Sequence, residues 1–179
     1  MQLEQNYFQL FDLPESYHVD QLQLSDRYRS LQKQLHPDRF AHAGEREQLR
    51  AVQYTAHVNE ALNTLKTPIK RAQYLVQLRG REACPESGGR IDPQFLIQQM
   101  ELRERLEQVK QHADPEAELE LMQRELESAW NALEQQFVEA LEDSAATATD
   151  LAVELVGKMQ FLDKLSHEIE LAEDQLTDY

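Results

Sequence analysis

The chain has 179 residues, of which 33 are acidic and 18 basic, so its formal net charge is −15. Five glycines and six prolines are too few for a collagen-like or many-turned all-β protein, and the acidic balance argues against sequence-independent binding to nucleic acid or to an anionic membrane surface. A lone cysteine, Cys84, excludes an intrachain disulfide and a multi-cysteine metal cage, so we expect protein partners, no cofactor and no metal site.

Helical start signals recur along the chain, and no strand-like alternation of any length accompanies them. Asp20 with Gln23 is typical of a capping box, while Thr67, Asp92 and Asp114 each stand before a proline that can open a helix. Thr149 or Asp150 can start the last helix. Helices are therefore expected over residues 6–11, 20–35, 44–65 and 68–78, and then over 93–111, 115–141 and 150–176.

A cluster of turn-forming residues between Arg79 and Arg90 divides the chain by composition. Residues 1–80 carry nine acidic and ten basic side chains, whereas the remaining 99 carry 24 and 8, a net charge of −16. This pattern predicts an all-α protein with an N-terminal domain over 1–79, a linker over 80–92 and a three-helix antiparallel bundle over 93–179.

The tripeptide His36-Pro37-Asp38 follows the second predicted helix. Proline ends that helix and favours an extended backbone at His36, so the tripeptide is expected in an exposed loop. The same helix should bury Leu24, Tyr28, Leu31 and Leu35. It should place Arg29 and Lys33 on its outer side and Arg27 on the flank. His36 as a general base oriented by Asp38 is a poor alternative, since the proline separates the two and no nucleophile accompanies them.

A His-Pro-Asp tripeptide between two amphipathic helices resembles the J domain. This resemblance implies docking on an ATP-driven DnaK-type chaperone and stimulation of its ATPase, without bond-breaking by the J protein itself. Arg27, Arg29 and Lys33 would then meet an acidic surface, and His36, Pro37 and Asp38 would form the docked loop.

Further segments are similar to the HscB family of iron–sulfur co-chaperones. They are residues 59–75 at the end of the J domain, residues 95–104 at the opening of the bundle, and Phe161-Leu162-Asp163-Lys164-Leu165 on the last helix. The resemblance covers essentially the whole chain. It implies two partners, the specialised chaperone HscA and the iron–sulfur scaffold protein IscU.

The helix that begins at Pro93 has two apolar faces. With Phe95 taken as zero angle, Leu102, Leu106 and Val109 fall within about 40° of it, whereas Leu96, Ile97 and Met100 lie at roughly 100° to 200°. By spacing alone, the second face could equally pack on the N-terminal domain. The family resemblance implies instead that it binds the scaffold, with Glu101 and Glu104 as a polar rim and Phe161 as a neighbour. Gln108 replaces an acidic residue that is usual in the family.

Two alternatives stay open from the sequence. A general J-domain co-chaperone would deliver unfolded clients, and an acidic helical adaptor would have no link to a chaperone. The N-terminus shows neither a basic leader nor an apolar run, and no apolar stretch approaches a membrane span, so a soluble protein of the cytoplasm is expected.

Overall fold

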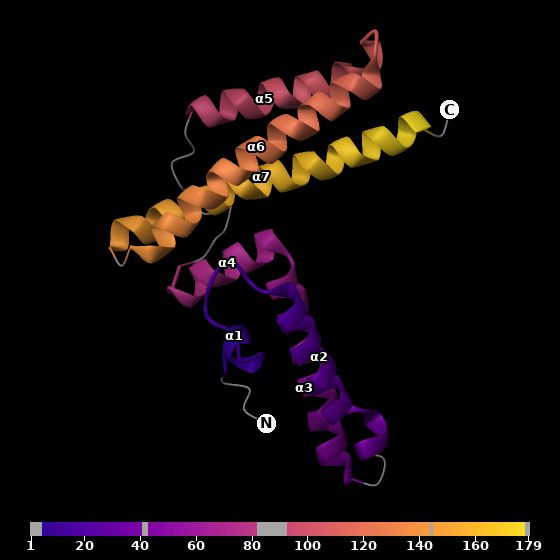
Figure 1. The fold of residues 1–179 in the computed structure, drawn as a ribbon, viewed down its shortest axis with the longest axis vertical. Helices are drawn as coiled ribbons and strands as arrows, with labels where there is room; N and C mark the ends of the chain where they lie inside the picture. The colour runs from indigo at the N-terminus through magenta and orange to yellow at the C-terminus, as the bar shows by residue number, and fades with distance from the viewer. Residues whose placement is uncertain (1–4, 41–42, 82–92, 144, 178–179) are drawn as a thin grey trace. The chain divides into compact units, whose positions relative to one another are not determined.

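A computed structural model describes residues 5–40, 43–81, 93–143, 145–177 of the chain. The chain divides into two compact units, Met1–Leu75 and Val76–Tyr179. All regular elements of the described residues are helical, as the sequence predicts (Figure 1). None of the helices in these residues is long and apolar enough to cross a membrane.

The first unit is built around an antiparallel helix pair. Its elements are α1 (Tyr7–Leu10), α2 (Gln21–Leu35), the 3₁₀ helix η1 (Pro37–Phe40), α3 (Glu45–Lys66) and the greater part of α4 (Pro68–Leu78). The side chain of Asp20 accepts hydrogen bonds from the backbone N–H groups of Leu22 and Gln23, so it caps α2 as expected. The structure adds a full capping box at α1, where Asn6 and Gln9 bond reciprocally.

Helices α2 and α3 hold each other through one buried seam. Leu24 and Leu35 of α2 are buried, while Tyr28 is only half-buried and donates its hydroxyl to the side-chain carbonyl of Asn59 on α3 at 3.0 Å. The other buried apolar residues of the first unit are Phe8, Leu10, Phe11, Leu13, Tyr17, Ala51, Val58, Ala61, Leu65, Ile69, Ala72 and Leu75. This seam fixes the two helices on either side of η1.

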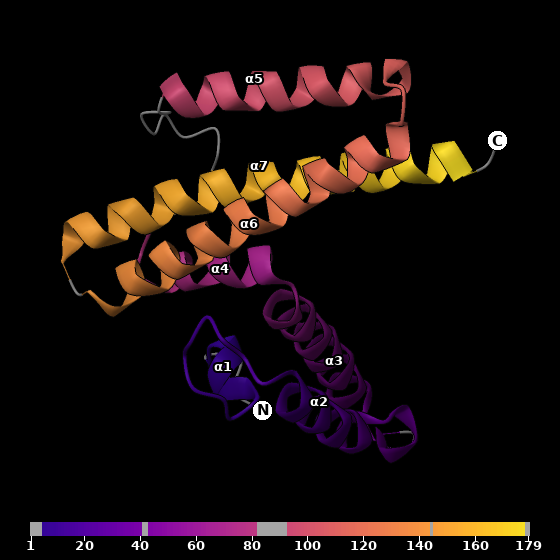
Figure 2. The ribbon, with the colours of Figure 1, turned by 45° about the horizontal axis from the view of Figure 1, so that its top comes forward.

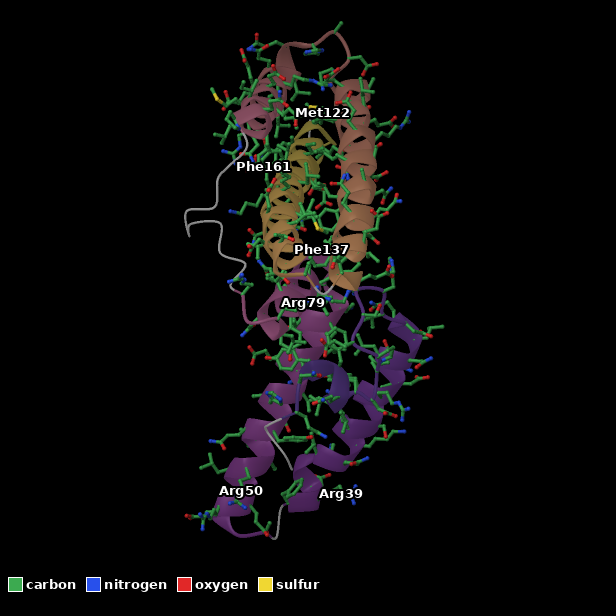
Figure 3. All side chains as sticks on the ribbon, turned by 90° about the vertical axis from the view of Figure 1, so that its left-hand side faces the viewer. Arg39, Arg50, Arg79, Met122, Phe137 and Phe161 are labelled. Carbon is green, nitrogen blue, oxygen red and sulfur yellow. The ribbon has the colours of Figure 1, made fainter. Side chains whose placement is uncertain are left out.

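The boundary between the two units falls inside α4, four residues before the predicted end of the N-terminal domain at Arg79. Val76 is fully buried, and the Arg79 guanidinium donates to the backbone carbonyls of Ala140, at 3.4 Å, and Leu141 (Figure 3). These carbonyls belong to the last turn of a helix, where they lack partners within the helix. The end of α4 therefore serves the second unit, a role that helix periodicity alone could not indicate.

The second unit is a bundle of three helices: α5 (Pro93–Gln108), α6 (Pro115–Glu142) and α7 (Ala146–Thr177), with the 3₁₀ turn η2 (Val109–Gln111) after α5. Helices α6 and α7 lie side by side along most of their length, with α5 beside them (Figures 1 and 2). Asp114 caps α6 through a bond from the Ala117 N–H at 3.1 Å. The three-helix bundle is thus confirmed.

The core of the bundle is formed mainly by α6 and α7. Its buried cluster consists of Val109, Leu119, Met122, Leu126, Phe161, Leu162, Leu165 and Ile169. On α7, Ala148 and Ala152 are buried, whereas Leu151 is 45% exposed. The helix also begins at Ala146 rather than at Thr149 or Asp150, because the alanines that precede Thr149 are strong helix formers.

Candidate functional site

The His36-Pro37-Asp38 tripeptide lies at the junction of α2 and α3. The backbone of His36 is extended, as expected before proline, but the residues after it form η1 rather than an irregular loop. The backbone N–H of Arg39 donates to the His36 carbonyl at 3.0 Å and closes the turn. His36 and Asp38 are both exposed.

The side chains of His36 and Asp38 come together across the proline. The Asp38 N–H donates to His36 Nδ1 at 3.3 Å, and an Asp38 carboxylate oxygen lies 3.4 Å from the same nitrogen. The proline between them does not hold the two side chains apart in space, because the tight turn folds one back toward the other. The contacts with Asp38 are made by Nδ1, so Nε2 is the ring nitrogen left for a partner. The turn thus presents an imidazole ring beside an exposed carboxylate.

The three predicted cations on α2 are all exposed, but their surroundings differ. Arg27 pairs with Asp12 at 2.8 Å, and Arg29 lies 3.6 Å from Asp26 on the same helix. Among the described residues, Lys33 has no salt bridge. Since an exposed ion pair is worth little and is easily exchanged, Arg27 and Arg29 can still turn to a partner, whereas Lys33 has no ion pair to break within the described residues.

Sequence reasoning attributed no role to Arg39, which the structure places in η1 directly after Asp38. Its side chain is exposed at the far end of the helix pair, on the same part of the first unit as Arg50 (Figure 3). The signal was present in the sequence, since Arg39 is adjacent to the tripeptide. Its exposure depends on the 3₁₀ turn, which the sequence did not indicate.

The second candidate site is an apolar patch on α5, which we call the α5 patch and define as Leu96, Ile97 and Met100. These side chains are 42%, 56% and 71% exposed, respectively. The opposite face of the helix packs on the bundle core through half-buried Phe95, Leu102 and Leu106. The helix therefore has the two apolar faces expected from the spacing. The second face is exposed, since no described part of the chain buries it.

Carboxylates border the α5 patch, as expected. Glu101 and Glu104 are exposed, and Gln108 donates its amide to Glu104 at 3.1 Å. Gln108 therefore does more than remove a negative charge, because it also engages one of the two rim carboxylates.

Phe161 lies below the patch rather than within it. The side chain is 9% exposed and belongs to the bundle core (Figure 3). Its ring meets that of Phe95 edge-on with centroids 5.7 Å apart, and the Arg103 guanidinium lies 5.8 Å from its ring centre. Phe161 thus supports the turn of α5 that carries Leu96 and Ile97.

Helix α5 has no fully buried residue, and charged side chains add to its half-buried apolar contacts with the bundle. Arg105 donates to Glu118 of α6 at 2.8 and 3.1 Å and to Glu125 at 2.7 Å. The hydrogen bonds that Arg105 donates to Glu118 and Glu125 raise the pKa of its guanidinium, which stays charged. Sequence reasoning missed this contact because the partners are 13 and 20 residues apart along the chain.

In the described part of the chain, no group of three or more His, Cys, Asp or Glu side chains could hold a metal ion. Both candidate sites are exposed surfaces of polar and apolar side chains. Their geometry suits contact with other macromolecules.

Comparison with known proteins gives a consistent result. Residues 91–170 match the family described as the HSCB C-terminal oligomerisation domain. The co-chaperone protein HscB homologue of Aeromonas hydrophila is 46% identical over 172 residues, which cover 96% of this chain and 98% of the homologue. The homologue from Vibrio cholerae is 44% identical over 172 residues, with the same coverage.

Solved structures agree with these relatives. The chaperone HscB from Vibrio cholerae superposes with a TM-score of 0.85 at 42% identity, covering 96% of this chain and 99% of the other. The human co-chaperone protein HscB also gives a TM-score of 0.85, at 28% identity, over 97% of this chain and 84% of the human one.

Proposed function

The chain belongs to the HscB family of co-chaperones, and from this membership we propose that it brings a DnaK-type chaperone like HscA together with an iron–sulfur scaffold like IscU. Residues 1–79 act as the J domain, 80–92 as the linker and 93–179 as the scaffold-binding bundle. The protein acts in the cytoplasm and breaks no bonds itself. Its cargo, the iron–sulfur cluster, stays on the scaffold.

The J domain stimulates the chaperone's ATPase through the His36-Pro37-Asp38 turn. The His36 ring and the Asp38 carboxylate supply polar contacts with the chaperone, while proline at position 37 fixes the backbone φ angle between them. Lys33, Arg27 and Arg29 steer the encounter with an acidic surface and fix the docking orientation.

The bundle binds the scaffold through the α5 patch. Leu96, Ile97 and Met100 supply apolar anchors, and the carboxylates of Glu101 and Glu104 form a rim that favours a partner with basic groups. Phe161 supports this site from the core, through its ring contact with Phe95.

One observation carries the proposal: an exposed His-Pro-Asp turn and an exposed, acid-rimmed apolar patch occur in one chain, in separate compact units. A soluble domain rarely exposes such an apolar cluster without a use. Two separate surfaces suit an adaptor that holds two proteins at once.

The test is a reconstituted ATPase assay with purified HscA-like chaperone and IscU-like scaffold. Wild-type protein should stimulate ATP hydrolysis, and scaffold should add to this stimulation. His36→Gln should lose ATPase stimulation and keep scaffold binding. The triple variant Leu96→Ala/Ile97→Ala/Met100→Ala should lose scaffold binding and keep the basal ATPase stimulation. Equal binding of many extended apolar peptides would favour a general J-domain co-chaperone. No stimulation by the wild-type protein would favour an adaptor unrelated to chaperones, and unchanged stimulation by His36→Gln would show that the J-domain mechanism is wrong.

A further inference from the structure

The α5 patch can present one fixed surface only if the rotation of α5 about its own axis is fixed. With Phe95 at zero angle, the core-facing residues of α5 lie near zero and the patch lies near the opposite side, at about 100° per residue. A rotation of the helix by one residue position would carry Met100 toward the side of α6 or α7. The contacts that oppose this rotation therefore control the shape of the surface offered to the scaffold.

The apolar contacts of α5 are too limited to do this alone. Phe95, Leu102 and Leu106 pack on the core, but each is only half-buried, and the helix contributes no fully buried side chain. Most of the stability of a helix in a protein comes from burying one face. Helix α5 buries less of its face than α6 or α7, whose core residues are fully covered.

Two arginines flank the core-facing stripe of α5 on its two sides. On the same helical wheel, Arg103 lies at about 80° and Arg105 at about 280°. Arg103 reaches α7, where its guanidinium lies 3.7 Å from Glu168 and over the Phe161 ring. Arg105 reaches α6, where it bridges Glu118 and Glu125. The arginines attach α5 to two different helices from opposite sides.

The Arg105 contact is the stronger of the two. Glu118 and Glu125 are seven residues apart and lie on one face of α6, so a planar guanidinium can bond both at once. The Glu118 side chain is only 15% exposed, which protects its bond from solvent screening better than an open surface pair. Arg103 has one longer contact to Glu168, and more than half of its side chain is exposed.

We infer that Arg105, with Arg103 as its weaker counterpart, is a positioning residue that fixes the rotational setting of α5 and so preorganises the α5 patch for the scaffold. This inference rests on the proposed function. It assigns Arg105 no contact with the scaffold. Without these arginine contacts, α5 samples several rotations about its axis. Scaffold binding must then select one of these rotations, which lowers the affinity.

The experiment measures scaffold affinity by calorimetry with the full chain and purified IscU-like scaffold. Arg105→Gln should weaken scaffold binding by about tenfold, because part of the binding free energy is then spent on ordering a loosened helix. The double variant Glu118→Gln/Glu125→Gln should weaken scaffold binding to a similar extent, although its substitutions lie on α6 and the sequence of α5 is unchanged. Arg105→Lys should fall between, because lysine keeps the charge but loses the bidentate geometry. The matched control is Arg124→Gln, which breaks the exposed Arg124–Glu120 pair of α6 and should leave affinity unchanged.

Amide hydrogen exchange across α5 supplies the readout that separates positioning from direct contact. Faster exchange in free Arg105→Gln, with α6 and α7 still protected, is the expected result. Wild-type affinity in Glu118→Gln/Glu125→Gln would overturn the inference, even if Arg105→Gln were impaired, because Arg105 would then act on the scaffold directly. Should Arg105→Gln fail to fold, wild-type affinity in Arg105→Lys would equally overturn it. If the triple α5-patch variant binds normally, the proposed function fails instead.

Discussion

The ring of Phe161 on α7 meets the ring of Phe95 on α5 edge-on, with 5.7 Å between their centroids. Lys158 lies 5.7 Å from the Phe95 ring centre, and Arg103 lies 5.8 Å from that of Phe161, so a cation borders each ring. Because Phe95 is adjacent to Leu96, this aromatic pair holds the end of α5 from which the exposed apolar patch starts. The pair connects the core of the bundle with the surface proposed to bind the scaffold.

Phe161 should act on scaffold binding through stability. Phe161→Ala should cost about 3–5 kcal/mol of unfolding free energy, because it leaves a cavity in the core, and it should weaken scaffold binding as well. Phe161→Leu should lose mainly the aromatic pair, about 1 kcal/mol. Chemical unfolding and calorimetry on the same samples measure both effects. Weakened scaffold binding in Phe161→Ala at unchanged stability would show that Phe161 is a direct contact.

The α5 patch should carry most of the scaffold affinity. Leu96→Ala/Ile97→Ala/Met100→Ala should weaken binding by at least about 30-fold, as expected for apolar anchors at an interface centre. The circular dichroism spectrum should not change, since these side chains are exposed. Leu121→Ala/Leu171→Ala, which removes two exposed leucines elsewhere on the bundle, is the control and should bind normally.

His36 and Asp38 should be needed for stimulation of the chaperone's ATPase but not for the stability of this protein. His36→Gln and Asp38→Asn should each reduce stimulation by about tenfold or more, because each removes a polar group at the proposed interface. Both residues are exposed, so thermal unfolding should shift little. Single-turnover ATP hydrolysis by the chaperone gives the measurement. Full stimulation by either variant would contradict the assigned role.

Chaperone docking should weaken with salt, and the cations of α2 should contribute unequally. Raising the ionic strength from about 0.1 to about 1 M shortens the Debye length from about 10 to about 3 Å, which screens exposed charges. Lys33→Gln should reduce the salt dependence of the Kd more than Arg27→Gln, because Arg27 must first give up Asp12. Equal slopes for the two variants would show that the Arg27–Asp12 pair does not compete with docking.

The first unit should lose stability at alkaline pH because of two stacked tyrosines. Burial raises the pKa of Tyr74 and of Tyr7, whose rings stack with centroids 4.3 Å apart. A raised folded-state pKa means that the folded protein holds these protons more tightly. The stabilisation is therefore complete below the ordinary tyrosine pKa of about 10 and is lost as the pH rises above it.

Tyr74→Phe should flatten this alkaline loss and cost about 1 kcal/mol near neutral pH, since the Tyr7 N–H bonds to the Tyr74 hydroxyl at 2.9 Å. Urea unfolding of both proteins between pH 8 and 11 measures the difference. The same alkaline slope in wild type and Tyr74→Phe would refute the assignment.

The sequence by itself determined the helical fold class, the approximate helix limits and the two candidate sites. These features depend on local chemistry: Pro37 must end α2, Asp20 and Asp114 cap the helices that follow them, and the spacing of Leu96, Ile97 and Met100 places them away from Phe95. Interactions within one helical turn are set by residues that are close in the chain. Local patterns can therefore predict them.

Only the tertiary structure decided how each site is supported. The approach of His36 to Asp38, the burial of Phe161 and the bridge from Arg105 to Glu118 and Glu125 depend on how the backbone turns and on which helix faces which. From the sequence alone, many carboxylates in the strongly acidic half of the chain were possible partners for Arg105. Packing selected two of them, because a guanidinium pairs with the groups that the fold brings within hydrogen-bonding distance.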